Sequence, residues 1–234
     1  MKITIFILFC LFLTTFAQAE LSEADDLYRT GQYQQALDLY AEAVEANPSD
    51  AGLLAYYAIL MVDYGNIRLE SEDASQLDDW FREAERYALE AMDLDPNISN
   101  VQFARAASLG SLAQFKNPFE LLGDVGIIRE AFETSLDLDP ENARALYAYA
   151  LFHDQLPFLL GGDAGLTIPL IERAVIADSQ NIQFRLTLSK MLLKKKRRDD
   201  AKTHLEVLLG QDAPNERDEA FLVEARALYQ EHFE

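Results

Sequence analysis

Four segments of the chain share one ending, in which a small residue is followed by mixed apolar and acidic positions and usually by a proline. The endings are Ala43–Pro48, Ala91–Asn97, Ser135–Asn142 and Ala174–Asn181, at intervals of 48, 44 and 39 residues. An alanine-rich segment of helical periodicity follows each ending. A single helix hairpin cannot bury its apolar stripe, so hairpins that recur in tandem must stack on one another. This repeat therefore predicts an all-α solenoid.

Each repeat is predicted to be a pair of helices. The spacing of apolar residues predicts first helices over 53–64, 101–113, 143–155 and 182–194, and second helices over 77–92, 127–138, 168–177 and 199–209. A further pair is expected in the first thirty residues after position 20, and a last amphipathic helix over about 217–233.

The first repeat has a pattern of glycine, tyrosine and alanine that resembles a known family. Gly31, Tyr33, Ala36, Tyr40 and Ala43 match the second half of a tetratricopeptide repeat (TPR), and Pro48 closes it. The resemblance implies a TPR-like α-solenoid of about five hairpins over 20–50, 51–97, 98–142, 143–180 and 181–213, with a C-terminal capping helix in 214–234.

Residues 1–19 are predicted to be a secretory signal peptide. Lys2 precedes an apolar run from Ile3 to Phe16, and Ala17 and Ala19 form a small-residue cleavage site before Glu20. We expect a periplasmic or secreted product that does not span the membrane; an uncleaved membrane anchor is the alternative. Cys10 is the single cysteine and lies in this segment, so the mature chain is expected to lack disulfides and thiolate chemistry.

Three repeats carry extra residues between their two helices, at Asn66–Gln76, Pro118–Gly126 and Pro157–Gly165. We expect these to be loops on one edge of the stack, where solenoids often bind partners. At the end of the first of them, Ser75 to Asp78 is expected to cap the next helix.

The third inserted segment matches an LP-x-x-GGD pattern, through Leu156, Pro157, Gly161, Gly162 and Asp163. It resembles the T component of TPR-associated TRAP transporters. That resemblance implies a periplasmic helical scaffold, often trimeric, that has a hydrophobic pore and pairs with a substrate-binding protein. The structural alternative is local: both glycines allow positive φ, Asp163 caps the next helix, and Phe158 to Leu160 cover the end of the hairpin.

The charge of the chain excludes one class of partner and marks one surface. A formal net charge of -20 disfavours nucleic acid, because phosphate backbones are bound by clustered cations. One basic run interrupts the acidity: Lys194, Lys195, Lys196, Arg197 and Arg198. It could dock an anionic head group or an acidic partner, or it could simply complement a helix dipole.

No residue set points to catalysis, a metal or a cofactor. His153, His204 and His232 are far apart, and the glycine-rich segment lacks the lysine of a phosphate loop. The acidic residues Glu70, Glu72, Asp73, Asp78 and Asp79 could suit calcium, but a solvated acidic loop explains them as well. We therefore expect no catalytic residues, no metal and no cofactor.

The first helices of stacked hairpins line the concave face in the TPR family. Counting along them predicts a partner groove formed by Ile59, Asp63, Arg144, Tyr147, Leu151, Asp154, Leu186 and Lys190. The leading hypothesis is an exported, non-enzymatic scaffold that binds a protein or peptide partner, with homo-oligomer formation left open. The alternative is a carrier of a small or lipophilic molecule, with an apolar pocket or pore between the loops at 119–122 and 158–160.

Overall fold

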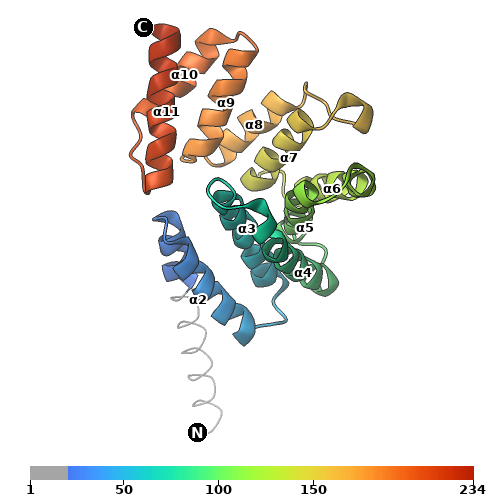
Figure 1. Ribbon diagram of the computed structural model, residues 1–234. Helices are drawn as coiled ribbons and strands as arrows, with labels where there is room; N and C mark the ends of the chain where they lie inside the picture. Colours follow the sequence, from blue (N-terminus) through green and yellow to red (C-terminus); the bar gives the residue numbers. More distant parts are fainter. Residues whose placement is uncertain (1–20) are drawn as a thin grey trace.

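The computed structural model describes residues 21–234, apart from the side chains of residues 118 and 119, and this part of the chain contains helices and no strands (Figure 1). The predicted all-α solenoid is confirmed. The predicted signal peptide lies outside the described residues, so its cleavage stays a prediction. No helix among residues 21–234 combines the length and the apolar character needed to cross a bilayer.

The helices form five hairpins and a final helix, as predicted from the repeats. Residues 21–29 are helical and pair with the next helix. The remaining α-helices are α2 (Tyr33–Ala46), α3 (Ala51–Arg68), α4 (Asp78–Leu94), α5 (Ser99–Leu112), α6 (Pro118–Leu138), α7 (Ala143–Gln155), α8 (Thr167–Ala177), α9 (Ile182–Lys194), α10 (Arg198–Leu209) and α11 (Glu216–Phe233). Three short 3-10 helices lie at η1 (Ala74–Gln76), η2 (Ala113–Phe115) and η3 (Phe158–Leu160).

The recurring ending has a structural role in three of the four repeats, where a polar residue at the ending or just after it begins the next helix. The side chain of Asp50 accepts a hydrogen bond from the backbone N–H of Leu53 at 3.0 Å. Asn142 and Asn181 cap α7 and α9 in the same way, each at 3.1 Å. A side-chain acceptor at this position satisfies one of the free N–H groups of the first turn. These three segments therefore stop one helix and start another, whereas α5 begins after Ile98 without a side-chain cap.

Buried alanines hold the helices close together. The alanines of the core that have no exposed surface include Ala36, Ala55, Ala58, Ala84, Ala88, Ala91, Ala104, Ala106, Ala145, Ala150, Ala174 and Ala201. Methyl side chains let neighbouring helices approach until their backbones nearly touch, and the larger core residues then fill the spaces beside them. One apolar core runs from the first helix into α10, and a second joins α9, α10 and α11.

A buried polar network ties the start of α5 to the end of α6 and to the start of α7. Ser99 and Ser135 each donate a hydroxyl hydrogen bond to the backbone carbonyl of the other, at 2.9 and 3.0 Å. The Asn142 amide reaches across to the Ser99 hydroxyl and to the Asn100 side chain, both at 2.9 Å. Because Ser135 is fully buried and Asn142 nearly so, these bonds are shielded from water. They hold the two helices of the third hairpin together and join that hairpin to the start of the fourth.

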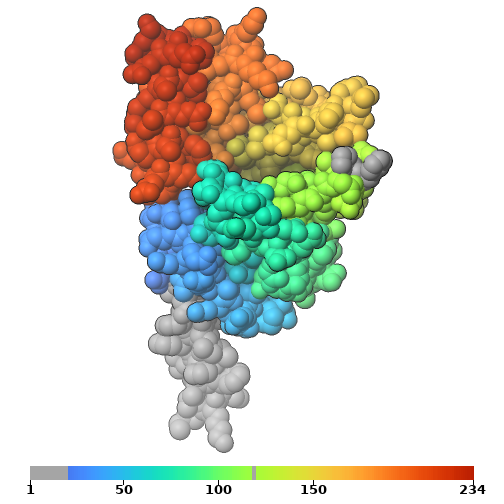
Figure 2. Space-filling view, viewed as in Figure 1, coloured from blue at the N-terminus to red at the C-terminus, as the bar shows by residue number. Residues whose placement is uncertain are grey.

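The stack curves until its two ends meet. In Figure 1 the hairpins follow an arc from α2 through α5 and α7 to α11, and the start of α11 lies beside the first hairpin. Asn215 donates a hydrogen bond to the carbonyl of Arg29 at 2.9 Å, although 186 residues separate them. Arg217 forms an ion pair with Glu70 at 2.7 Å. Figure 2 shows the same closure as a continuous surface at the left edge.

One of the expected loops is instead helical, which corrects the sequence prediction. Residues 118–126 form the first part of α6. Asn117 and Glu120 exchange hydrogen bonds between side chain and backbone N–H at 3.1 and 3.2 Å, which is a capping box that starts the helix early. Lys116 and Asp124 then pair at 2.6 Å across its first turns. The corresponding segment at Pro157–Gly165 has no glutamate at that position and remains a loop.

The insertion in the second repeat is also shorter than expected, because α3 continues to Arg68 and includes Asn66. Ser75 does not cap α4. Instead, the Asp73 side chain accepts hydrogen bonds from the N–H and the hydroxyl of Ser75, at 2.9 and 2.8 Å, and so begins η1.

The alanine contacts lead to a stability prediction. Ala104→Leu places three extra carbon atoms in a fully buried position of α5, and we expect it to lower the free energy of unfolding by about 1–3 kcal/mol. Ala220→Leu, on the exposed side of α11, is the matched control and should change it by less than about 0.5 kcal/mol. Urea unfolding followed by circular dichroism measures both. Equal stability of the two variants would contradict close packing at Ala104.

Candidate functional site

An ion pair joins distant repeats on the concave, inner face of the curved stack. Asp63 lies on α3 and Arg144 on α7, and their side chains meet at 2.8 Å across 81 residues of sequence. Protein surrounds both groups on most sides, yet 41% of the Asp63 side chain and 35% of the Arg144 side chain remain exposed. Groups that are enclosed but still reached by solvent are typical of a concave wall, where a ligand can contact them.

Half-buried tyrosines surround this pair. Tyr28 and Tyr33 contact each other edge to face, with ring centres 5.0 Å apart. The Arg144 guanidinium lies over the ring of Tyr56, 5.7 Å from its centre. Tyr147 stacks on Phe184 at 4.3 Å and its hydroxyl is 3.1 Å from that of Thr187. With Arg217 from α11, we call Tyr28, Tyr33, Tyr56, Asp63, Arg144, Tyr147 and Arg217 the inner site.

Burial dominates the electrostatics of the inner site. It raises the pKa of the Asp63 carboxyl above the ordinary value, and the charges of Arg144 and Arg217 offset this only in part. Burial also raises the pKa of Tyr28 well above its usual range, with the negative charge of Asp63 adding to the effect. Burial alone would lower the pKa of Arg144, but Asp63 and the tyrosines raise it on balance. The guanidinium of Arg144, which stays protonated, therefore favours the charged form of Asp63 against the effect of burial.

The structure brings together part of the predicted groove. Asp63, Arg144 and Tyr147 belong to the inner site. Leu151 is half-buried on α7, Asp154 lies 3.8 Å from Lys194, and Lys190 pairs with Glu224 at 2.7 Å. Two placements were wrong: Ile59 and Leu186 are 1% and 2% exposed, because the neighbouring hairpin covers that side of α3 and α11 covers that of α9.

The sequence prediction missed most of the tyrosines, as well as Arg217. One signal was present, since six of the ten tyrosines lie between positions 28 and 64. Such clustering in one part of a repeat protein indicates a shared surface. The tyrosines lie near Arg217 only because the stack curves, and no local sequence pattern encodes that curvature.

The loop with the LP-x-x-GGD pattern has a rigid backbone. Gly161 adopts a positive φ of 88°, as predicted. Gly162 does not, but it allows a close approach: a Cβ there would lie 1.7 Å from the carbonyl oxygen of Leu156. The Arg129 side chain donates to the carbonyls of Leu160 and Gly161 at 3.0 and 3.2 Å. Asp163 caps the turn at Gly165 rather than α8 itself, at 2.8 Å. Leu156, Pro157, Gly161, Gly162 and Asp163 therefore shape this loop.

The tip of this loop is apolar and exposed, contrary to expectation. Phe158 and Leu159 are 86% and 94% exposed, so they neither cover the hairpin nor line an enclosed pocket. On the facing segment, residues 118–122 form the first turn of α6 and Leu122 is 50% exposed. The apolar pocket suggested for a carrier is thus not formed by the side chains of Phe158 and Leu159.

The basic run is spread among separate contacts. Arg197 pairs with Asp200 at 2.6 Å and with Glu172 at 3.2 Å, and Lys194 approaches Asp154. Arg198 donates to the carbonyl of His232 and lies over the ring of Phe233. Lys195 and Lys196 are exposed, and within residues 21–234 they form no ion pair. Arg197 and Arg198 therefore join the start of α10 to α8 and α11, while Lys194 joins α9 to α7.

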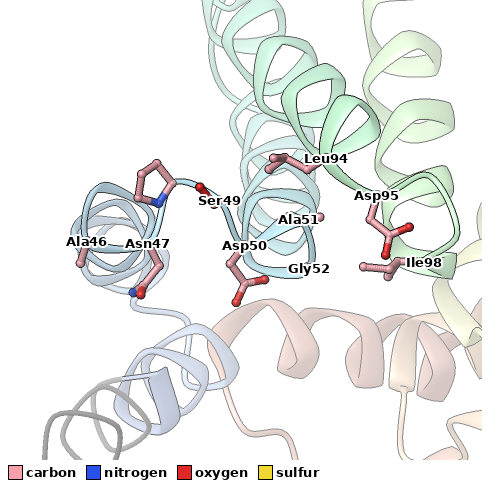
Figure 3. A pocket seen from close by; sticks show the side chains of 10 residues that line it. Ala46, Asn47, Ser49, Asp50, Ala51, Gly52, Leu94, Asp95 and Ile98 are labelled. Atoms are coloured by element: carbon pink, nitrogen blue, oxygen red, sulfur yellow. The ribbon is translucent and has the colours of Figure 1, made fainter. Parts of the chain in front are cut away.

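An open hollow of about 670 Å³ lies at the turns between α2 and α3 and between α4 and α5 (Figure 3). Asp50 and Asp95 lie on its two sides, and both already accept backbone hydrogen bonds, from Leu53 at 3.0 Å and from Asn97 at 2.9 Å. The hollow is lined by two of the recurring endings, and its shape follows from stacking them. Among residues 21–234 no group of histidine, cysteine and acidic side chains is arranged to hold a metal ion.

Comparison with known proteins gives a family and a fold. A family model described as regulator of microtubule dynamics protein 1-3 matches residues 20–156. Regulator of microtubule dynamics protein 1 of Caenorhabditis elegans is 28% identical over 163 residues, covering 63% of this chain and 72% of the relative.

Two solved structures have a similar fold. A thermophilic TPR protein of Thermus thermophilus superimposes with a TM-score of 0.66 at 18% identity, over 92% of this chain and 98% of that one. PilF of Pseudomonas aeruginosa gives 0.53 at 14% identity, over 92% and 84%. These likenesses confirm the TPR-like fold.

His153 gives a prediction for the pH dependence of stability. Its Nδ1 accepts a hydrogen bond from the N–H of Asp163 at 3.1 Å, which requires an unprotonated nitrogen. Burial, together with the charge of Arg129, lowers its pKa in the folded state, although Asp163 and Glu133 act in the opposite direction. The unfolded chain therefore binds the proton more readily, and stability is lost as pH falls below about 6.5.

The measurement compares the wild type with His153→Gln, whose side-chain oxygen can accept the same bond. Urea unfolding at a series of pH values between about 5 and 8 should show a smaller loss of stability at low pH in the variant. His204, whose pKa burial and Arg185 also lower, is unchanged in both proteins and gives a common background. Parallel curves would refute the role assigned to His153.

Proposed function

The chain belongs to the regulator of microtubule dynamics protein 1-3 family, and we propose that it is a non-enzymatic TPR-like scaffold that binds a protein or peptide partner at its inner site. The main observation behind this proposal is that Asp63 and Arg144 meet on the inner face, among half-buried tyrosines. Tyrosine and arginine provide much of the binding energy at protein interfaces. Most of the inner site lies within the residues that the family model matches.

The family suggests what kind of process the scaffold serves. The Caenorhabditis elegans relative is named for regulation of microtubule dynamics, and we propose that the partner of this chain acts in that process. A substrate-binding protein of a TRAP-type transporter is the finer partner suggested by the LP-x-x-GGD loop. That suggestion rests on five residues whose contacts serve the loop itself, so the family gives the stronger support.

Partner capture tests the inner site. We expect Asp63→Asn and Tyr147→Ala each to reduce recovery of the cellular partner at least tenfold, since a loss of about 1.4 kcal/mol in binding corresponds to a factor of ten. Affinity purification with quantitative mass spectrometry measures recovery. Arg82→Ala, on the exposed face of α4, is the control and should leave capture unchanged. Full capture by both inner-site variants would exclude the inner site as the binding surface.

Export is a competing proposal, supported by the layout of residues 1–19: an exported chain would bind its partner outside the cytoplasm, and not among cytoplasmic microtubule proteins. We expect the protein recovered from the cells that produce it to begin at Glu20 and to be found outside the cytoplasm. Intact mass and cell fractionation measure this. A product that retains Met1 and sediments with membranes would instead support an uncleaved anchor.

A further inference from the structure

We propose that the inner site recognises a basic, extended peptide segment, one that presents lysine or arginine side chains from a partner protein. This inference rests on the proposed function and adds the chemistry of the partner. Three features of the inner site support it: the balance of its charges, the arrangement of its tyrosines, and two buried donors that lack acceptors.

The charges around the inner site are unequal. Four carboxylates, those of Asp25, Asp63, Glu70 and Asp218, lie near enough to its tyrosines to raise the pKa of Tyr33 or Tyr56, to which burial contributes most. Two guanidinium groups oppose them, and each is already committed: Arg144 to Asp63 at 2.8 Å and Arg217 to Glu70 at 2.7 Å.

Two acids are therefore left without a cation. Within residues 21–234, neither Asp25 nor Asp218 forms an ion pair. Asp25 accepts hydrogen bonds only from the hydroxyls of Tyr40 and Tyr56, at 2.6 and 3.5 Å. Asp218 accepts one from the amide of Asn215 at 2.8 Å. A ligand that brings positive charge would complete both positions, whereas an acidic ligand would meet repulsion.

The contacts of Arg144 show how a cation can bind at the inner site. The Arg144 guanidinium lies between the Asp63 carboxylate, at 2.8 Å, and the face of Tyr56, at 5.7 Å. A cation between a carboxylate and an aromatic face gains from both interactions. Asp25 accepts a hydrogen bond from the hydroxyl of the same Tyr56, at 3.5 Å, and offers a second carboxylate near this tyrosine. The geometry there suits a lysine or arginine side chain of a partner.

Two buried donors indicate that the ligand also supplies backbone acceptors. The hydroxyl of Tyr28 and the Nε–H of Arg217 are shielded from solvent and have no hydrogen-bond partner among the described residues. The charges of Asp63 and Arg144 lie close enough to Tyr28 to act on its pKa. Burial makes the largest contribution and raises that pKa. Donors left unsatisfied are costly, and a movement of the surrounding side chains that opened them would let the carbonyls of an extended peptide satisfy them.

The contact between the two ends of the stack limits the size of the ligand. The contacts of Asn215 with Arg29 and of Arg217 with Glu70 join the two ends of the stack beside the inner site. A single extended strand fits beside such a closed edge more readily than a folded domain. The formal net charge of -20 would further favour encounter with a basic segment.

Fluorescence anisotropy with three labelled peptides tests the inference. The probes are twelve-residue glycine–serine peptides that carry four lysine or arginine residues, four glutamates, or no charge. We expect the basic peptide to bind the full-length protein at least tenfold more tightly than the neutral one, and its affinity to fall as salt increases. Tighter binding of the acidic or the neutral peptide would overturn the inference.

A matched pair of variants locates the effect. Asp25→Asn keeps an oxygen for the Tyr40 hydroxyl but removes the charge, and it should weaken the basic peptide about tenfold, or about 1.4 kcal/mol. Asp79→Asn removes the same charge from the exposed start of α4 and should have little effect. Thermal unfolding confirms that both variants fold. Equal affinities in the two variants would overturn the inference.

Failure of this inference can be told apart from failure of the proposed function. A protein that still captures its cellular partner through Asp63, but binds none of the three peptides, refutes the basic-peptide inference and leaves the scaffold function in place. If the wild-type protein binds the basic peptide but the Asp63→Asn variant still captures the cellular partner in full, the partner is not captured at the inner site.

Discussion

The close approach of helices at buried alanines is the constraint on which the rest of the structure depends. Ala88 on α4 and Ala104 on α5 have no exposed surface, and larger side chains at such positions would push the helices apart. Each hairpin leaves one apolar side to be covered by the next, so this spacing is passed from repeat to repeat. The curvature of the stack is the sum of these local contacts.

That curvature creates the inner site. Asp63 and Arg144 are separated by 81 residues, and they meet only because α3 and α7 lie on the inside of the same arc. Burial would disfavour either charge alone, so the pair is stable as a unit. The network of Ser99, Ser135 and Asn142 joins the start of α7 to the third hairpin, which lies between α3 and α7 in the chain. The chemistry of the inner face thus depends on contacts in the core.

The sequence predicts local structure well where a helix boundary has a local cause. The limits of α7 and α9 agree with the prediction, because Asn142 and Asn181 begin those helices through their own side chains. The start of α6 was missed because two similar segments, at 118 and at 157, differ at the two residues of a capping box: Asn117 and Glu120 in the first correspond to Leu156 and Leu159 in the second. Ile59, Leu186 and the tyrosines around Asp63 could not be placed from local patterns, since their exposure depends on the packing and curvature of distant hairpins.

The hydrogen bond from Asn215 to Arg29 changes how such a stack can come apart. An open solenoid has two free ends, and its terminal repeats fray independently because each has a neighbour on one side only. Here the final helix and the first turn are neighbours, so neither end is a true terminus. Loss of the first hairpin removes support from α11, and the reverse also holds. The repeats are thereby coupled in a circle, and melting from one end is converted into a shared, more cooperative transition.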